Sequence, residues 1–242
     1  MVIAIKNPQF DEDRTFLGGF IEYTGSAIGQ LRSWSLIRSV SRLYNEFSQS
    51  PSSAATAVDT TAGTAISALG VVLVPMRTKD AYGAIVSIGN QDGIPLQRKI
   101  DLATRASMEA ASSWMSAGVW VTGNPALRSA TAVTDLTQDV VDLKVSVEDY
   151  RAASNYETLA SGDVLEALEH TRKYQMFRIV KAVLSVAAAL FAIMMLLTGI
   201  QILPLVLAIL LTLTTTIVAI RRDIFKNEGR FQLIDLNRPA VV

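Results

Sequence analysis

The longest uncharged segment of the chain is the feature that most constrains its fold. Residues 182–220 contain no Asp, Glu, Lys or Arg, a run of 39 positions. One membrane-spanning helix needs about 20 mainly apolar residues, so this run is long enough for two. Gly199 and Pro204 interrupt its middle, and both residue types disfavour continuous helix. We therefore predict a transmembrane helical hairpin over 176–222, with its turn at Gly199 and Pro204.

The two arms of this hairpin, 182–198 and 205–220, would each be about 25 Å long, slightly less than a hydrocarbon core of about 30 Å. Basic residues flank both arms, whereas the turn carries no charge. They are Arg172, Lys173, Arg178 and Lys181 before the first arm, and Arg221, Arg222, Lys226 and Arg230 after the second. Because basic flanks stay on the cytoplasmic side, we predict an integral membrane protein with both termini in the cytosol. The alternative is a helical hairpin buried in a soluble core, but neither arm has a polar face.

The remaining sequence predicts an all-α fold, in which a cytoplasmic helical bundle precedes the C-terminal hairpin. Residues 1–175 form the soluble or membrane-peripheral helical region, and 223–242 form a short cytoplasmic tail. Within the helical region, Asn124 and Pro125 suit the N-cap and first position of a helix. A break at Ser161-Gly162-Asp163 precedes a helix that is expected to continue into the first membrane arm.

An amphipathic helix is predicted over 14–48. Its apolar stripe includes Phe16, Phe20 and Trp34 at helical spacing, and Arg32, Arg38 and Arg42 lie off that stripe. A basic amphipathic helix of this kind can lie in a membrane interface. The same stripe is also what a helix packed into a bundle presents, so both interpretations stay open.

A third apolar segment lies at 60–76, between Asp59 and Arg77. It is only about 17 residues long and contains several threonines, so it is marginal as a membrane span. Pro75 is expected to end this helix, because proline removes a backbone donor and clashes with the preceding turn.

The helix after Pro125 has the most regular apolar pattern in the chain. Its apolar residues recur at alternating steps of three and four, which is the heptad spacing of a helix–helix seam. The seam residues are Val133, Leu136, Val140, Leu143, Val147 and Tyr150. About three heptads fit either a helix inside a bundle or a seam for a helical partner or a second copy of the chain.

No set of residues in the sequence supports catalysis, and we expect neither an enzyme nor a bound cofactor or metal. The chain has no cysteine and one histidine, His170, which is expected at the surface or an interface. Asp135, Asp139 and Asp142 share one helix face, and a solvated face is the favoured interpretation. With a formal net charge of zero, the chain lacks the basic surface of a general nucleic-acid binder.

Two close membrane arms joined by a short turn, with basic flanks at Lys181 and Arg221, resemble the bilobed pattern of chlamydial inclusion membrane proteins. The Gly199–Pro204 turn and the cysteine-free helical region before the arms are similar as well. This resemblance implies secretion by a type III apparatus and insertion into a host-derived vacuole (inclusion) membrane. Both soluble ends would then recruit host proteins.

Together these features predict a membrane-anchored, non-enzymatic scaffold or effector whose partners are membrane lipids and a helical protein or itself. The alternative is a membrane-shaping protein that combines a hairpin wedge with helix 14–48, an arrangement similar to reticulon-type hairpins.

Overall fold

The computed structural model describes residues 16–48, 50, 52–90, 93–158, 160–198, 202–226, 228, 233–234 and 236, and in these residues every regular element is an α-helix. The helices are α1 (Phe16–Gly25), α2 (Ala27–Phe47), α3 (Ser53–Ser87), α4 (Leu96–Thr122), α5 (Pro125–Glu157), α6 (Asp163–Thr198) and α7 (Ile202–Lys226). The all-α fold predicted from the sequence is confirmed at this level.

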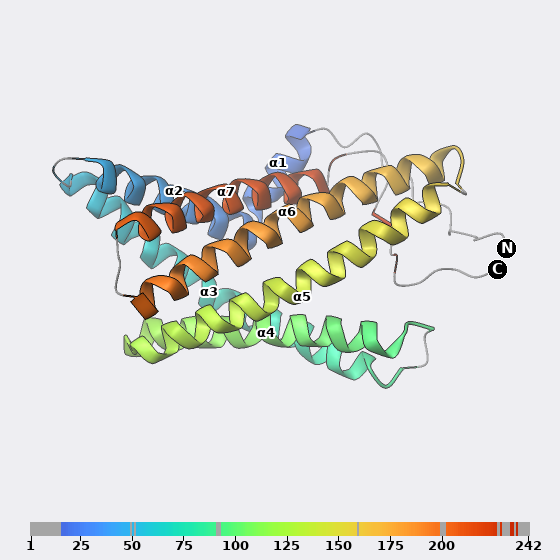
Figure 1. Ribbon diagram of the computed structural model, residues 1–242, viewed down its shortest axis with the longest axis horizontal. Helices are drawn as coiled ribbons and strands as arrows, with labels where there is room; N and C mark the ends of the chain where they lie inside the picture. Colours follow the sequence, from blue (N-terminus) through green and yellow to red (C-terminus); the bar gives the residue numbers. More distant parts are fainter. Residues whose placement is uncertain are drawn as a thin grey trace.

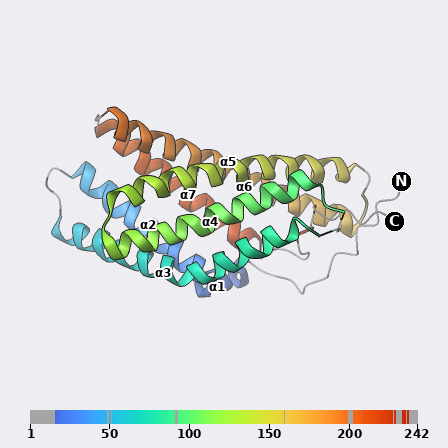
Figure 2. The ribbon, with the colours of Figure 1, turned by 90° about the horizontal axis from the view of Figure 1, so that it is seen from below.

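Six long helices run along a common axis and close into a ring (Figures 1 and 2). Each of α2 to α6 contacts the next helix in the chain, and α7 returns to contact α2, while α1 packs against both α2 and α7. Among the described residues no helices on opposite sides of the ring are in contact. The predicted membrane arms are therefore the C-terminal half of α6 and most of α7, and both pack within this ring.

The helix boundaries follow local capping chemistry. Asn124 caps α5 by accepting a 2.9 Å hydrogen bond from the backbone N–H of Ala126, as the Asn124-Pro125 pair predicts. Gly123 ends α4 in the left-handed region at a φ of 66°, and Gly162, at a φ of 59°, precedes α6. Glycine adopts this conformation without the steric cost that a side chain imposes, so the sharp reversals occur at these positions.

The single helix predicted over 14–48 is wrong at one point, because α1 ends at Gly25 and α2 begins at Ala27. Ser26 has an extended backbone, and its Oγ accepts a 2.9 Å hydrogen bond from the N–H of Gly29. The Ser26 hydroxyl thus satisfies a backbone N–H that has no partner within the helix, and α2 begins as a separate helix.

The predicted helix end at Pro75 is also wrong, since α3 continues through Pro75 to Ser87. Proline removes one intrahelical hydrogen bond, but α3 packs against α2 on one side and α4 on the other, and this packing keeps the helix continuous. The marginal segment 60–76 is thus part of a long helix. By length and composition α3, Asp163–Phe191 of α6 and Leu205–Lys226 of α7 can each cross a membrane.

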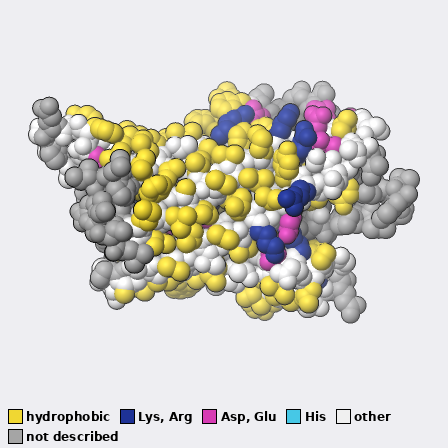
Figure 3. All heavy atoms as spheres, viewed as in Figure 1, with side chains coloured by type: hydrophobic (Ala, Val, Ile, Leu, Met, Phe, Trp, Pro, Cys, Tyr) yellow, Lys and Arg dark blue, Asp and Glu magenta, His cyan; other side chains and the backbone are white. Residues whose placement is uncertain are grey.

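The interior of this ring is more polar than that of a water-soluble bundle. Its buried side chains include serines, aspartates, Lys99 and Arg178 beside apolar residues, many of them alanines, of which Leu168 and Val145 are the largest that are fully buried. Large apolar side chains are instead exposed on every helix, and in Figure 3 they cover the middle of the visible face, with charged groups gathered toward one end. An apolar exterior around a polar interior is expected of a bundle that contacts lipid or partner helices.

Candidate functional site

The inner face of α5 carries the aspartates that the sequence placed in solvent, and that prediction is wrong. Asp139, Asp142 and Asp149 are buried, and Asp135 is half-buried. The physical reason lies on the neighbouring helix, because α6 supplies Arg178 and Lys181 to the same interface. Paired carboxylates lose much less free energy on burial than isolated ones.

Arg178 is at the centre of a charged cluster between α5 and α6. Its Nη2 lies 2.5 Å from Asp142 Oδ1, and its Nη1 lies 3.3 Å from Asp149 Oδ2 and donates to Gln175 Oε1 at 2.9 Å. From α4, Arg98 pairs with Asp149 and Arg105 lies 3.3 Å from Asp142. The cluster therefore ties three helices together through charge-assisted hydrogen bonds.

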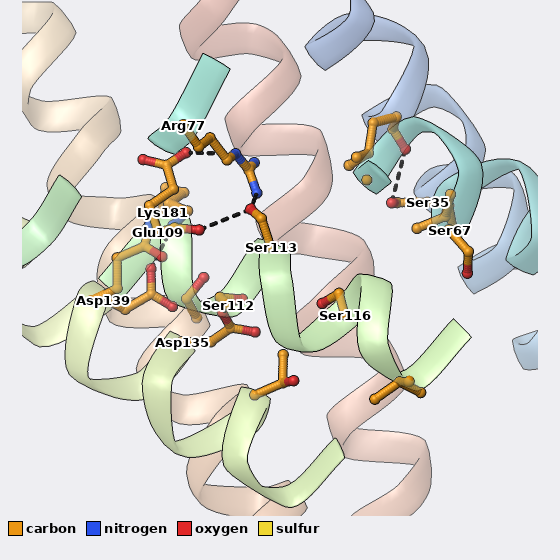
Figure 4. Close-up of a pocket in the computed structure, with 17 residues that line it drawn as sticks. Ser35, Ser67, Arg77, Glu109, Ser112, Ser113, Ser116, Asp135, Asp139 and Lys181 are labelled. Atoms are coloured by element: carbon orange, nitrogen blue, oxygen red, sulfur yellow. Dashed lines mark hydrogen bonds and ion pairs between the residues drawn. The ribbon is translucent and has the colours of Figure 1, made fainter. Parts of the chain in front are cut away.

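A cavity of about 620 Å³ lies beside this cluster, inside the ring. It is lined by α2, α3, α4, α5 and α6, and its lining is polar apart from Leu31, Ile66, Val119 and Gly70. Figure 4 shows the polar side chains of this lining converging from α3, α4, α5 and α6. The volume lies in the range of small-molecule sites, which are usually about 300–1,000 Å³.

Five charged side chains line this cavity. Lys181 Nζ lies 2.5 Å from Asp139 Oδ1, and Arg77 Nε lies 3.3 Å from Glu109 Oε1. Arg77 also donates to Ser113 Oγ at 2.6 Å (Figure 4). The fifth, Asp135, accepts a 2.5 Å hydrogen bond from Ser112 Oγ and forms no ion pair with any described residue. Two cations and three carboxylates give the cavity a formal charge of −1, located at Asp135.

The protonation of these aspartates follows from their surroundings. Burial raises the pKa of Asp135, and the hydrogen bond from Ser112 only partly offsets that effect. Burial likewise raises the pKa of Asp139 despite its pairing with Lys181. Burial also raises the pKa of Asp142, but the positive charges of Arg178 and Arg105 outweigh this effect, so the pKa of Asp142 is lowered. Burial thus makes both Asp135 and Asp139 more costly to ionise than an exposed carboxylate, and only Asp139 forms an ion pair among the described residues.

A second cavity of about 530 Å³ adjoins the first, because Ser67 and Val119 line both. Asp59 lies between Arg38 and Arg42, with Oδ1 at 2.9 Å and 3.0 Å from the two Nε atoms. All three side chains are partly exposed to solvent. We call this second cavity, which borders α2 and α3, the vestibule.

The seam residues of α5 lie on the outer half of the helix. Val133 is 56% exposed and Val140 is 50% exposed, and the other four are partly exposed. None of the six belongs to the buried core, which α5 supplies through Val145, Ser146 and Ala153 instead. Val133 and Val140 are therefore the seam residues that are available at the surface of the ring.

The predicted interface residues of α1 and α2 divide into two groups. Phe16 and Phe20 of α1 are exposed, and the Arg221 guanidinium lies 5.7 Å from the Phe16 ring centroid. Trp34 is half-buried in α2, and Arg32 points into the bundle, where it pairs with Asp223 of α7. The membrane contact of 14–48 stays a prediction.

The predicted hairpin turn residues and His170 complete the comparison with the sequence predictions. Pro204 lies in the first turn of α7, while Gly199 lies outside the described residues. His170 is half-buried at an interface inside the bundle, where its ring stacks on Phe225 with a centroid separation of 4.4 Å.

Sequence reasoning missed the cavity and the α5–α6 charge cluster, although one signal for them was present. Asp139 and Asp142 are three residues apart, as are Arg178 and Lys181, and antiparallel helices bring such pairs together in reverse order. Asp139 meets Lys181 and Asp142 meets Arg178 in this register. Arg77, Glu109 and the cavity serines gave no comparable signal, because they are spread over α2, α3, α4 and α6.

No protein-family model matches this chain, and comparisons with curated proteins and with solved structures give no match either.

Proposed function

We propose that this protein is a membrane-anchored, non-enzymatic scaffold that self-associates through the seam of α5. The observation that carries this proposal is the orientation of α5, whose aspartates face the interior while Val133 and Val140 are exposed. Exposed apolar residues of a heptad seam, such as these two, are suited to contact with a helix of another molecule.

The chemistry beside the seam favours a second copy as the occupant. Lys144 and Glu148 lie on the exposed side of α5, four residues apart and of opposite charge. Each pairs with a residue of α4, Lys144 with Asp101 at 2.5 Å and Glu148 with Arg98 at 3.2 Å, so pairing between copies would exchange these contacts. In two copies of the same seam, flanking residues of opposite charge can pair across the interface and add specificity. Membrane anchoring through α3, α6 and α7 would confine the copies to one surface and raise their effective concentration.

Cysteine cross-linking tests this proposal directly, because the chain has no native cysteine. We expect Val140→Cys to form a disulfide-linked dimer under mild oxidation in native membranes. The matched control is Tyr82→Cys on α3, which is 70% exposed but lies outside the seam, and it should stay monomeric. Equal cross-linking of both variants, or capture of a different protein by Val140→Cys alone, would contradict self-association.

Membrane shaping is the second candidate, and α1 is the observation that favours it. Phe16, Leu17, Phe20 and Ile21 are all exposed on this ten-residue helix, which packs against the membrane candidate α7. An apolar surface helix beside a membrane helix could enter one leaflet and bend it. We expect the protein to tubulate liposomes and Phe20→Glu with Ile21→Glu to abolish tubulation; tubulation unchanged by these substitutions would exclude α1 as the wedge.

The scaffold proposal also extends to the location that the sequence resemblance implies, a host-derived vacuole membrane. Its support is limited to the hairpin pattern of α6 and α7 and to their apolar surface. Expression in host cells with a C-terminal tag would test it, and a tag that never reaches the vacuole membrane would contradict it.

A further inference from the structure

The cavity inside the ring is the one feature that the scaffold proposal leaves unused. It encloses about 620 Å³ and is bordered by five helices, so its lining residues come from sequence positions as distant as Leu31 and Ser185. Ionisable side chains are costly on helices that cross membranes and usually mark sites of function when they face a cavity. Arg77 on α3 and Lys181 on α6 are such residues.

The charge of the cavity favours a cation as its ligand. Asp139 and Glu109 each form an ion pair within the lining, whereas Asp135 forms none with any described residue: it accepts a hydrogen bond from Ser112 and feels Lys181 and Arg77 only at longer range. A ligand with one positive charge would therefore neutralise the lining, and a ligand with a negative charge would be repelled.

The hydroxyl groups of the lining also favour a ligand that donates hydrogen bonds, as an organic cation does. Ser35, Ser67, Ser113 and Thr131 donate their protons to backbone carbonyls in their own helices, at 2.7–2.9 Å. Ser112 donates to Asp135 and Ser185 donates to Asp139. A hydroxyl whose proton is committed still has lone pairs, so these groups offer acceptors to the cavity. An acceptor-rich cavity binds a ligand that is rich in hydrogen-bond donors.

We propose that this cavity binds a small organic cation that carries a primary ammonium group and several hydroxyl groups, with the ammonium at Asp135. Three N–H donors of an ammonium match Asp135 and neighbouring hydroxyl oxygens, and the ligand hydroxyls match the remaining serines. The lining contains no aromatic side chain, so it lacks the cage that suits quaternary ammonium groups. Its volume is also far larger than a single metal ion requires.

The vestibule is next to this site, because it shares Ser67 and Val119 with the inner cavity. Asp59 pairs with both arginines there, and the partial exposure of all three side chains lets water and salt screen their charge.

Titration calorimetry on the full chain in detergent tests this inference with glucosamine as the probe. Glucosamine carries one ammonium and several hydroxyls, while N-acetylglucosamine has nearly the same shape without the charge. We expect saturable binding of glucosamine, at least tenfold weaker binding of N-acetylglucosamine, and no competition from sodium chloride at equal concentration. Absence of glucosamine binding, equal affinity for the two sugars, or displacement by sodium would overturn the proposal.

The substitution Asp135→Asn keeps the size of the side chain and removes its charge. We expect it to weaken glucosamine binding at least tenfold, whereas Asp80→Asn, at an exposed acid of α3, should leave binding unchanged. A second measurement is thermal unfolding, in which saturating glucosamine should raise the melting temperature of the unsubstituted protein but not that of Asp135→Asn. Unchanged binding by Asp135→Asn, or an equal rise in melting temperature for both proteins, would overturn the assignment of the ammonium to Asp135.

Discussion

At the scale of single residues, Arg178 shows how a charge can be buried in this fold. Its side chain is 8% exposed, and two carboxylates and one amide oxygen surround its guanidinium. The cluster thus resembles a polar core, in which each member depends on the others for its charge balance.

We predict that Arg178→Met lowers the free energy of unfolding by about 3–5 kcal/mol, because it leaves buried carboxylates without a cation. This loss corresponds to a drop in melting temperature of roughly 2–4 °C for each kcal/mol. Thermal unfolding of the purified protein in detergent measures the effect. Arg151→Met, at an exposed position of α5, is the matched control, and equal melting temperatures for the two variants would contradict the role of the cluster.

Asp135 gives a second residue-scale prediction, which concerns pH. Burial raises its pKa in the folded protein above the unfolded value, so the folded chain binds this proton more tightly. As pH rises from about 4, the folded state is the one that must release a proton, and the free energy of unfolding therefore falls. Asp135→Asn has no such proton, so its melting temperature should decrease less with rising pH than that of the unsubstituted protein. Parallel pH profiles of the melting temperature for Asp135→Asn and the unsubstituted protein would contradict a raised pKa of Asp135 in the folded state.

At the scale of elements, the all-α class was predicted correctly, but only some of the helix boundaries were. The Asn124-Pro125 start of α5 and the break at Gly162 depend on neighbouring residues, so the sequence carries them locally. The errors at Gly25–Ala27 and at Pro75 arose where a cap or the packing of adjacent helices outweighed the simpler expectation. The burial of Asp139 and Asp142 was missed because their partners, Lys181 and Arg178, lie on α6, and no pattern within α5 indicates them.

The junction of α1 and α2 supplies an element-scale prediction. A Cβ built on Gly29 would lie 1.8 Å from the carbonyl oxygen of Tyr23, a backbone atom that cannot move without shifting α1. We therefore expect Gly29→Ala to destabilise the protein by about 1–3 kcal/mol, in the range of overpacked sites. Gly83→Ala in α3 meets no atom within 4 Å and should be neutral or slightly stabilising, since alanine favours helix. Chemical unfolding in detergent compares the two, and an equal or larger loss for Gly83→Ala would contradict this account.

At the scale of the whole molecule, closure of the ring was beyond the reach of sequence patterns. Contact between α2 and α7 joins residues about 190 positions apart, as in the pair Arg32–Asp223, and no local periodicity encodes it. The cavity depends on that closure and on five helices, so it could not be predicted either. The candidate membrane spans of α6 and α7 could be predicted from the sequence, because the length and apolar composition of 182–220 are sufficient to indicate them.

The central claim is that α6 and α7 lie in a membrane with their basic flanks on one side. Single cysteines at Lys173, Leu190, Ile217 and Lys226, introduced one at a time into the cysteine-free chain, test it in sealed vesicles with a membrane-impermeant maleimide. We expect Lys173→Cys and Lys226→Cys to react from the same side, and Leu190→Cys and Ile217→Cys to react from neither side. Labelling of the two flanks from opposite sides, or labelling of the arm positions as fast as the flanks, would contradict the account.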